Sequence, residues 1–309
     1  MANRAIISPS YILGKETMLR NNEHPIFDIK KILIDKGTKD QTIEVFKLSR
    51  KKENLPYFKE EETKKERIVI HYTMGQLEGD LVTLTGGSKP NLSVSYVIGR
   101  DGSIYLLFNS RYWSYHLGPG SVGSNAAQSP VTIGIELSNV GPLTRVGDEY
   151  FMRVDTDRGP KDLFYCSVDE TDLYQELDQP FKGSKVYATY PDEQYDALIR
   201  LLRYLTALWG IPRAFLPESE RYKVSDKVPS FKGIVTHVNY RPDGKSDIGP
   251  AFKWKEVIEG VTAETYDSTV PRTRGLSAPD RVVKSEKAIR SKKGAARGIF
   301  EEPTEDWNG

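Results

Sequence analysis

The chain has 309 residues, of which 38% are hydrophobic and 10% aromatic, which is enough apolar material for one large domain or one domain with appendages. Lysine and arginine number 44 against 43 aspartate and glutamate residues, a net charge of +1, so composition gives no reason to expect nucleic acid or an anionic membrane as the main partner. The single cysteine, Cys166, cannot form an internal disulfide, so the fold does not depend on an oxidising compartment.

The first residues of the chain mix charged and polar side chains with short apolar groups and contain no apolar segment of signal-peptide length. No stretch approaches the roughly 20 apolar residues of a membrane span. We therefore expect a protein that is synthesised in the cytoplasm without a signal peptide and has no membrane span. A substrate outside the cell would be reached only after release or non-classical delivery.

Residues 1–65 hold only short apolar groups, such as those at 32–34 and 43–46, and a charged run extends from Lys59 to Arg67. The apolar groups predict a few strands or a helix, and the charged run predicts a solvated linker. We expect residues 1–65 to form an N-terminal extension, whose role the sequence does not reveal.

Beyond this run the apolar residues follow the pattern of a folded domain. The β-branched run at 68–72 predicts a buried central strand. Runs at 94–98 and 103–108 flank the turn residues Asp101-Gly102, and Asp-Gly between two such runs is a strong hairpin signal. A further strand is expected at 131–137.

A long stretch from Asn139 to Tyr190 follows this strand. Within it, runs at 149–154 and 163–168 are separated by Asp, Arg, Gly and Pro residues, which predicts an inserted hairpin. Such an insertion could wall one side of a cleft.

The clearest helix begins at Pro191, which suits a first helical position, and ends at Gly210. Its apolar residues recur at helical spacing, so one face packs on the sheet, and this stripe is core rather than a cofactor site. The run at 234–237 predicts a last short strand, and residues 252–258 predict a closing helix.

The composition changes again after Gly260. Residues 271–298 carry nine basic residues against two acidic ones, a net charge of +7, with little apolar content. We expect residues 261–309 to form a basic tail that is disordered when free. Its charge suggests a delivery partner or an anionic wall polymer as its binding partner, and a solvated tail without a role remains the alternative.

Two of the four histidines, His71 and His237, fall at the carboxyl ends of predicted strands, where open α/β sheets place their sites. Asp247 follows His237 by ten residues, across a loop that contains Gly and Pro. Two histidines and one carboxylate leave a fourth tetrahedral position for water, which is the pattern of a catalytic zinc site. A histidine at a strand end is also found as an ordinary hydrogen-bonded polar residue, and spacing alone leaves both interpretations open.

Short motifs surround these residues, in the order Ile70-His71-Tyr72-Thr73, Ser95 to Gly102, Tyr115-His116-Leu117-Gly118, Ile133 to Asn139, Thr236-His237 and Lys245 to Pro250. Together they resemble those of the N-acetylmuramoyl-L-alanine amidases, the zinc amidases related to phage amidase endolysins and peptidoglycan recognition proteins. The resemblance covers Arg67 to Gly260 and implies a catalytic domain at 66–260 with an α/β fold, in which helices flank a central mixed β-sheet.

The resemblance implies that His71, His237 and Asp247 bind Zn²⁺, with aspartate where some members have cysteine. A zinc ion acidifies water to a pKa of about 7 and polarises a carbonyl group. The resemblance implies a general acid–base role for Glu136, and Lys245 with Tyr96 would stabilise the oxyanion. Outside the motifs, Lys245 would be interpreted as a solvated lysine and Tyr96 as a strand-packing aromatic.

The motif that contains His116 is similar to a Trp-His-Ala-Gly motif of the family, from which Tyr115 and Leu117 depart. We expect His116 to touch substrate or orient the attacking water. Asn139 and Arg111 are candidates for hydrogen bonds to the glycan or stem peptide, because amides and guanidinium groups suit acetamido and carboxylate partners.

These observations predict hydrolysis of the amide bond between N-acetylmuramic acid and L-alanine, with peptidoglycan or muropeptides as the substrate and no organic cofactor. The presence of Glu136, Lys245 and all three metal ligands argues against one alternative, a non-catalytic muropeptide-binding module. A second alternative is a cytosolic amidase that recycles soluble muropeptides. The N-terminal extension and the basic tail favour a lytic or delivered enzyme that acts on the cell wall.

Overall fold

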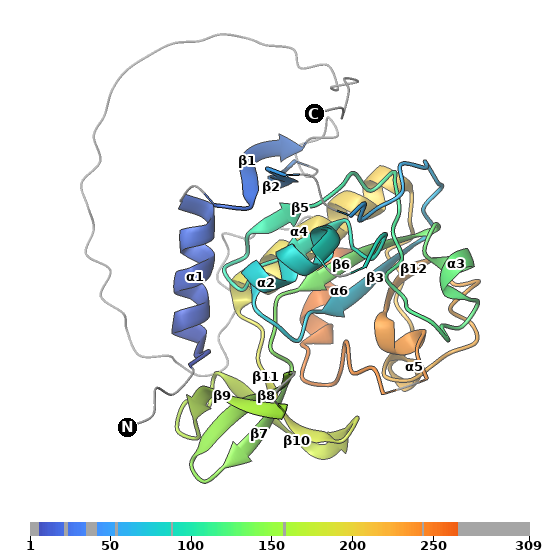
Figure 1. Cartoon of the computed structure of the whole chain (residues 1–309). Coiled ribbons are helices and arrows are strands. Elements are labelled where there is room, and N and C mark those ends of the chain that lie inside the picture. Colours follow the sequence, from blue (N-terminus) through green and yellow to red (C-terminus); the bar gives the residue numbers. More distant parts are fainter. Residues whose placement is uncertain are drawn as a thin grey trace. The chain divides into compact units, whose positions relative to one another are not determined.

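A seven-stranded mixed sheet forms the centre of the computed structural model, which describes residues 6–21, 24–34, 42–52, 55–87, 89–156, 159–242 and 244–264. Figure 1 shows this sheet with helices around it. In spatial order its strands are β1 (Phe27–Ile34), β2 (Ile43–Arg50), β5 (Ile104–Leu106), β4 (Tyr96–Ile98), β6 (Thr132–Leu137), β3 (Arg67–Tyr72) and β12 (Gly233–Thr236).

Four consecutive strands of this sheet are parallel: β12, β3, β6 and β4. β4 also pairs with β5, as an antiparallel hairpin. Every residue of β3 is buried, because β3 lies inside the sheet and both faces of the sheet are covered. The central strand at 68–72 and the hairpin across Asp101-Gly102 are therefore confirmed.

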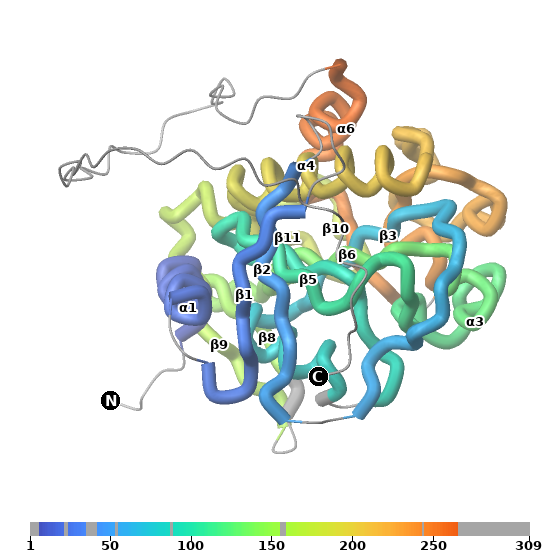
Figure 2. Tube along the Cα trace, turned by 90° about the horizontal axis from the view of Figure 1, so that it is seen from above, coloured from blue at the N-terminus to red at the C-terminus, as the bar shows by residue number. Residues whose placement is uncertain are grey.

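Helices cover the two faces of the main sheet. α4 (Asp192–Trp209) and α6 (Trp254–Thr262) contact each other and lie on the same side of the sheet, as Figure 2 shows. Their apolar residues belong to the core on that face. α2 (Leu77–Val82) contributes Leu77 and Leu81 to the core on the other face. The predicted ends of α4 agree with the structure to within one residue: Pro191, expected at the first helical position, is the N-cap, and Gly210 adopts the left-handed conformation that ends a helix.

The N-terminal region adds α1 (Pro9–Asn21) and the antiparallel strands β1 and β2. β2 pairs in parallel with β5, so this region extends the main sheet at its edge. α1 buries Ile12 against residues of the inserted stretch and Leu19 against the core shared with α2. The division of the chain at residue 65 stays a prediction, although these contacts join the two segments.

The stretch between β6 and α4 forms a second sheet of five strands. It contains the expected hairpin, because β8 and β9 are antiparallel neighbours, and three further strands extend it beyond the prediction. In spatial order the strands are β10 (Tyr174–Phe181), β11 (Ser184–Ala188), β7 (Pro142–Val146), β8 (Glu149–Thr156) and β9 (Gly159–Ser167).

The closing helix, α6, runs from Trp254 to Thr262, a few residues beyond the expected end. Arg203 on α4 donates hydrogen bonds to the carbonyl groups of Gly260, Ala263 and Glu264, which attaches the segment after Gly260 to the core. The basic stretch at 271–298 lies outside the described residues. No described helix has the length and apolarity that a membrane crossing requires.

Short helical segments connect the larger elements. The 3₁₀ turn η3 directly follows β12 and carries a metal-site candidate, His237. The segments are η2 (Thr83–Gly87), α3 (Asn125–Gln128), α5 (Glu218–Arg221) and η3 (His237–Asn239).

Candidate metal centre

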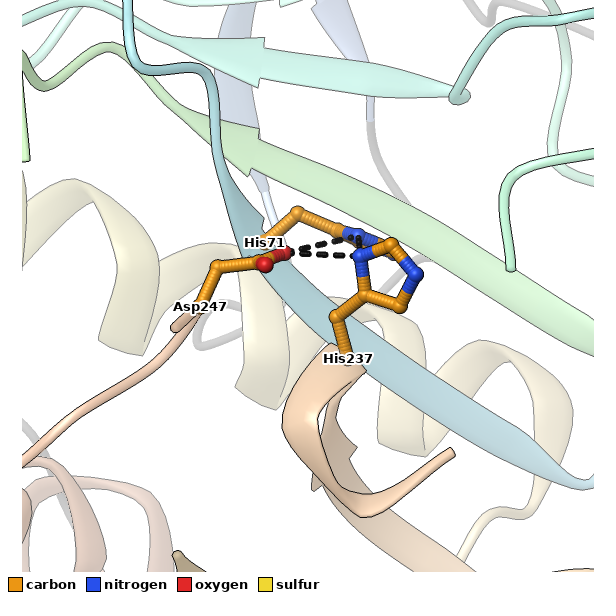
Figure 3. A group of neighbouring side chains, drawn as sticks. All are labelled: His71, His237 and Asp247. Carbon is orange, nitrogen blue, oxygen red and sulfur yellow. Dashed lines mark hydrogen bonds and ion pairs between the residues drawn. The ribbon is translucent and has the colours of Figure 1, made fainter. Parts of the chain in front are cut away.

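The carboxyl ends of β3 and β12 bring His71 and His237 together. The two strands are parallel neighbours in a register that pairs Thr236 with Ile70, so the residue that follows each partner emerges at the same end of the sheet. Asp247 reaches the two imidazoles from the loop between η3 and α6, as Figure 3 shows. Among the residues that the structure describes, these three form the one group of His, Cys, Asp or Glu side chains arranged to hold a metal ion.

The three candidate ligand atoms are close to the spacing that a tetrahedral metal ion requires. His71 Nδ1 lies 3.0 Å from His237 Nδ1, and Asp247 Oδ2 lies 3.3 Å and 2.8 Å from these two nitrogens. A tetrahedral zinc ion with bonds of about 2.0–2.1 Å separates its ligand atoms by about 3.3 Å. Two imidazole nitrogens and one carboxylate oxygen also match the ligand types of catalytic zinc, so the residues present fit this ion.

The proton on His237 is placed by a backbone carbonyl group. His237 Nε2 lies 2.8 Å from the carbonyl oxygen of Leu117, which can only accept a hydrogen bond. In the neutral ring the proton is therefore on Nε2, and Nδ1 presents a lone pair toward His71 and Asp247. A lone pair and a carboxylate at 2.8 Å repel each other unless a cation lies between them, either a metal ion or a second ring proton on Nδ1 that makes the ring an imidazolium.

The loop that carries Asp247 is tied to β3 and to η3, the turn that follows β12. The backbone N–H of Val238 in η3 donates to the Asp247 carbonyl oxygen at 2.8 Å. The hydroxyl groups of Tyr72, the last residue of β3, and Ser246 are hydrogen-bonded to each other. Ile248 is fully buried in the main core. These contacts hold the carboxylate beside the imidazoles.

Burial and neighbouring charges set the protonation states of the metal-site candidates. Burial, with a contribution from His237, lowers the pKa of His71 to about 4. Burial acts to raise the pKa of Asp247, but His237 and His71 outweigh it and hold this pKa below its usual range. Near neutral pH the centre therefore presents a neutral His71 imidazole and an ionised Asp247, the forms that bind a metal.

Glu136 lies beside this centre, because β6 pairs with β3 in a register that sets Glu136 opposite His71. Burial, then Asp247 and Asp80, raise the pKa of Glu136 well above its ordinary value, against the opposing charge of Lys245. Its Oε2 atom is buried and has no hydrogen-bond partner among the described residues. A buried carboxyl group with a raised pKa and an unused oxygen is suited to accept and release a proton.

Lys245 is half-buried two residues before Asp247. Its positive charge acts to lower the pKa of both Glu136 and His71, which places it near the two groups. The structure therefore brings Lys245 to the same centre as Glu136 and the three metal-site candidates.

His116 is also at the centre, but both of its ring nitrogens already have protein partners. Nδ1 lies 2.9 Å from His71 Nε2, and Nε2 lies 2.8 Å from the hydroxyl oxygen of Thr132. The expected role in touching substrate is therefore not supported by this geometry, because neither nitrogen is free to bind one.

Tyr96 does not reach the centre, which corrects the placement expected from the motif. In β4, Val97 pairs with Glu136 and Tyr96 with Ile135, so Tyr96 points to the opposite face of the sheet. There it is buried in the main core with Tyr204 of α4. Burial, with a contribution from Tyr204, raises the pKa of its hydroxyl group.

Asn139 and Arg111 are likewise not placed to bind a substrate at this centre. Asn139 is 1% exposed, and its side chain bonds the Thr189 carbonyl oxygen and the Gly141 N–H, which shapes the turn after β6. Arg111 is exposed and forms an ion pair with Glu62 at 3.2 Å. Its backbone bonds Thr63, which precedes β3, so it lies toward the strand end opposite His71.

Three residues near the site were not singled out from the sequence: Tyr72, Asp80 and Thr132. Two of them have a signal in the sequence. Tyr72 follows His71 directly in the same motif. Thr132 precedes Glu136 by an even number of strand positions, which predicts that Thr132 and Glu136 lie on the same face of the strand. Asp80 comes from α2, and no pattern in the sequence connects it with Glu136.

The comparison with protein families found a match for most of the chain. Residues 61–250 match the family model Amidase_2, described as N-acetylmuramoyl-L-alanine amidase. The matched segment covers more than half of the 309 residues. The comparison with curated proteins found no match.

Solved structures with similarity to this chain include AmpD, AmiD and LysC. A selenomethionine derivative of AmpD has 17% identity and a TM-score of 0.39, with 68% of this chain and 93% of that chain covered. AmiD from E. coli, in complex with the substrate anhydro-N-acetylmuramic acid-L-Ala-D-gamma-Glu-L-Lys, has 19% identity and a TM-score of 0.40, with 74% and 65% covered. The amidase LysC from Clostridium intestinale URNW has 14% identity and a TM-score of 0.32, with 63% and 83% covered. The chain thus spans slightly less than two thirds of AmiD.

Proposed function

Because the chain belongs to the N-acetylmuramoyl-L-alanine amidase family, we propose that it uses zinc to hydrolyse the amide bond between N-acetylmuramic acid and L-alanine of peptidoglycan. The observation that carries the zinc dependence is the convergence of His71 Nδ1, His237 Nδ1 and Asp247 Oδ2 within 3.3 Å of one another. No organic cofactor is required for hydrolysis of an amide.

His71, His237 and Asp247 would hold the zinc ion, whose chemistry is to polarise a carbonyl oxygen and to acidify water. Glu136 takes a proton from the attacking water, because its raised pKa makes the carboxylate a stronger base near neutral pH. The same carboxyl group then gives the proton to the alanine nitrogen as it leaves. Lys245 supplies positive charge where negative charge develops on the carbonyl oxygen.

The setting that we propose is a lytic or delivered enzyme acting on cell-wall peptidoglycan. The support comes from the net charge of +7 in residues 271–298, which lie outside the segment that matches the amidase family. A recycling amidase would instead prefer small soluble muropeptides. Comparing cleavage rates on intact sacculi and on soluble muropeptides separates the two settings, and a preference for the soluble substrates would favour recycling.

Metal analysis tests the zinc dependence. Protein purified without added metal is expected to contain close to one zinc ion per chain, and the content should fall sharply in His237→Ala. Exhaustive chelation should abolish cleavage, and added zinc should restore it. Full activity of the chelated wild-type protein would refute the proposal.

A further inference from the structure

A chain of hydrogen bonds begins on β6 and ends at one of the proposed metal ligands. The Thr132 hydroxyl oxygen lies 3.0 Å and 3.1 Å from the carbonyl oxygens of Gln128 and Ser129. It also lies 2.8 Å from His116 Nε2, and His116 Nδ1 lies 2.9 Å from His71 Nε2. Thr132 is 3% exposed, so water does not compete for its hydroxyl group.

The backbone carbonyl groups at the start of this hydrogen-bond network determine which atom donates in each of its bonds. A carbonyl oxygen only accepts, so the single proton of the Thr132 hydroxyl is donated to Gln128 or Ser129. The Thr132 oxygen can then only accept from His116, which places the His116 proton on Nε2.

The same reasoning fixes the proton on His71. With the His116 proton on Nε2, the other nitrogen of the neutral ring, Nδ1, carries a lone pair. That lone pair accepts from His71 Nε2–H. In the neutral His71 ring Nδ1 is then unprotonated, and it is this atom that faces His237 and Asp247.

The strand itself provides the space for this arrangement. Thr132, Gly134 and Glu136 occupy alternate positions of β6 and therefore lie on the same face of this strand. A Cβ atom on Gly134 would lie 3.2 Å from His116 Cγ and 2.7 Å from Val94 Cγ1, so the absence of a side chain leaves room for the His116 ring. The three alternate positions thus supply a hydroxyl group, space for an imidazole, and the carboxyl group of the proposed reaction.

We propose that Thr132 and His116 are positioning residues, which hold His71 in the Nε2–H tautomer and so present its Nδ1 to the metal ion. This inference rests on the proposed function for the identity of the metal. It assigns His116 to the orientation of a ligand, in place of the contact with substrate that the motif suggested. Loss of such an outer partner typically weakens metal affinity by about 10- to 100-fold.

The first test compares Thr132→Val with Thr132→Ser. Valine keeps the shape of threonine and removes the hydroxyl group, whereas serine keeps the hydroxyl group. The zinc affinity of the full-length protein, measured by competition with a chromogenic chelator, should fall about 10- to 100-fold in Thr132→Val. It should stay within about threefold of wild type in Thr132→Ser.

Thr206→Val is the matched control. Thr206 is a buried threonine on α4 whose hydroxyl group also donates to a backbone carbonyl, that of Arg203. This substitution should leave zinc affinity unchanged.

Nitrogen-15 NMR of labelled histidines in the metal-free protein reads the tautomer directly. His71 should be in the Nε2–H form in wild type and Thr132→Ser, and in a mixture of forms in Thr132→Val. If Thr132→Val does not fold, His116→Asn and His116→Leu take its place, because the asparagine oxygen can still accept from His71 Nε2–H and leucine cannot. The asparagine variant should then retain more zinc affinity than the leucine variant.

Wild-type zinc affinity and an unaltered His71 tautomer in Thr132→Val would overturn the proposal, as would equal losses of zinc affinity in the valine and serine variants. The expected tautomers and zinc affinities in a protein that cleaves no muropeptide would support the positioning role and count against the proposed function. The two failures are therefore distinguishable.

Discussion

Glu136 shows what a single residue contributes at this centre. Burial and the carboxylates of Asp247 and Asp80 raise its pKa, while the proposed ligand atoms belong to other side chains. Glu136→Gln should therefore keep zinc and substrate affinity but lose about 100- to 10,000-fold in turnover, since the amide keeps the shape and removes the basic oxygen. Turnover on soluble muropeptides and zinc content should be measured on the same preparations. Wild-type turnover in the variant would assign the proton transfer to another group.

Glu16 gives a prediction about stability that does not involve the metal centre. It is 2% exposed on α1, and burial, with a contribution from Asp101, raises its pKa to about 7. In the unfolded chain the carboxyl group ionises near the ordinary pKa of glutamate, 4.5. The stabilising effect of the protonated group is thus full below pH 4.5 and is lost as the pH rises through about 7.

The loss is up to about 3 kcal/mol, at 1.36 kcal/mol per pKa unit. Between pH 5 and pH 8, the unfolding free energy measured with urea should decrease less in Glu16→Gln than in wild type. Glu60→Gln, at an exposed position, serves as the control. An identical pH dependence in Glu16→Gln and wild type would contradict this account of α1.

At the residue scale, a site residue can be predicted from the sequence where its signal lies within a short segment of the chain. His71 and His237 were found because each ends a strongly apolar strand, and Asp247 because it follows His237 by ten residues. Tyr96 was misplaced because a shift of one residue moves a strand side chain to the other face. The motif alone does not give the register that pairs Val97 with Glu136.

At the scale of elements, the inserted sheet supports the loop that carries Asp247. Phe181, at the end of β10, packs with Leu177, Tyr187 and Ala251. A Cβ atom on Gly249 would lie 2.7 Å from the Phe181 ring, so the ring and the loop backbone are in close contact. The β10–β11 hairpin therefore restricts the movement of the loop that supplies the proposed carboxylate ligand.

Phe181→Ala should loosen this loop. We expect a loss of about 1–3 kcal/mol in unfolding free energy, less than for a fully buried phenylalanine, together with a severalfold decrease in zinc affinity. Chemical unfolding and chelator competition measure the two effects. Val146→Ala, on β7 of the same sheet and 55% exposed, should change stability by less than about 0.5 kcal/mol. Unchanged zinc affinity in Phe181→Ala would show that the loop is held without the inserted sheet.

Elements with dense apolar patterns were predicted from the sequence, and elements with mixed patterns were not. β3 is a continuous β-branched run and α4 has a regular apolar stripe, and both were predicted close to their observed bounds. β10 contains Gln, Glu, Asp and Pro among its eight residues, so its sequence does not alternate as a half-buried strand would. The prediction of a hairpin at β8 and β9 therefore missed the rest of the second sheet.

At the scale of the whole molecule, the family and the enzyme class predicted from the sequence are confirmed by the match over residues 61–250. The pairing of β2 with β5 was not predicted, because the pairing joins Phe46 with Tyr105 across a long separation in the chain. Strand propensity is a property of a single segment of the chain. Which strands pair at the edge of a sheet depends instead on the side chains that two distant segments bury together.

The basic segment at 271–298 carries a prediction of its own. Truncation after Ser268 removes it while keeping α6 and the Arg203 contacts near Glu264. The truncated protein should cleave small soluble muropeptides at the wild-type rate and bind intact sacculi less tightly at low salt. The difference should shrink with added salt, because exposed charges are screened over about 10 Å at 0.1 M. Equal sedimentation of both proteins with sacculi at low ionic strength would favour a role in docking on a delivery partner.

The central claim is the identity of the bond that is cut, and mass spectrometry of digestion products tests it most directly. Purified peptidoglycan is incubated with the zinc-loaded protein, with Glu136→Gln and with buffer, and the soluble products are identified by mass. The account predicts free stem peptides that begin with L-alanine, together with glycan whose lactyl groups end in carboxylates, in the wild-type digest and nearly none in the other two. Products that retain the bond between muramic acid and L-alanine while another bond is cut, or no products from a zinc-loaded wild-type protein, would contradict it.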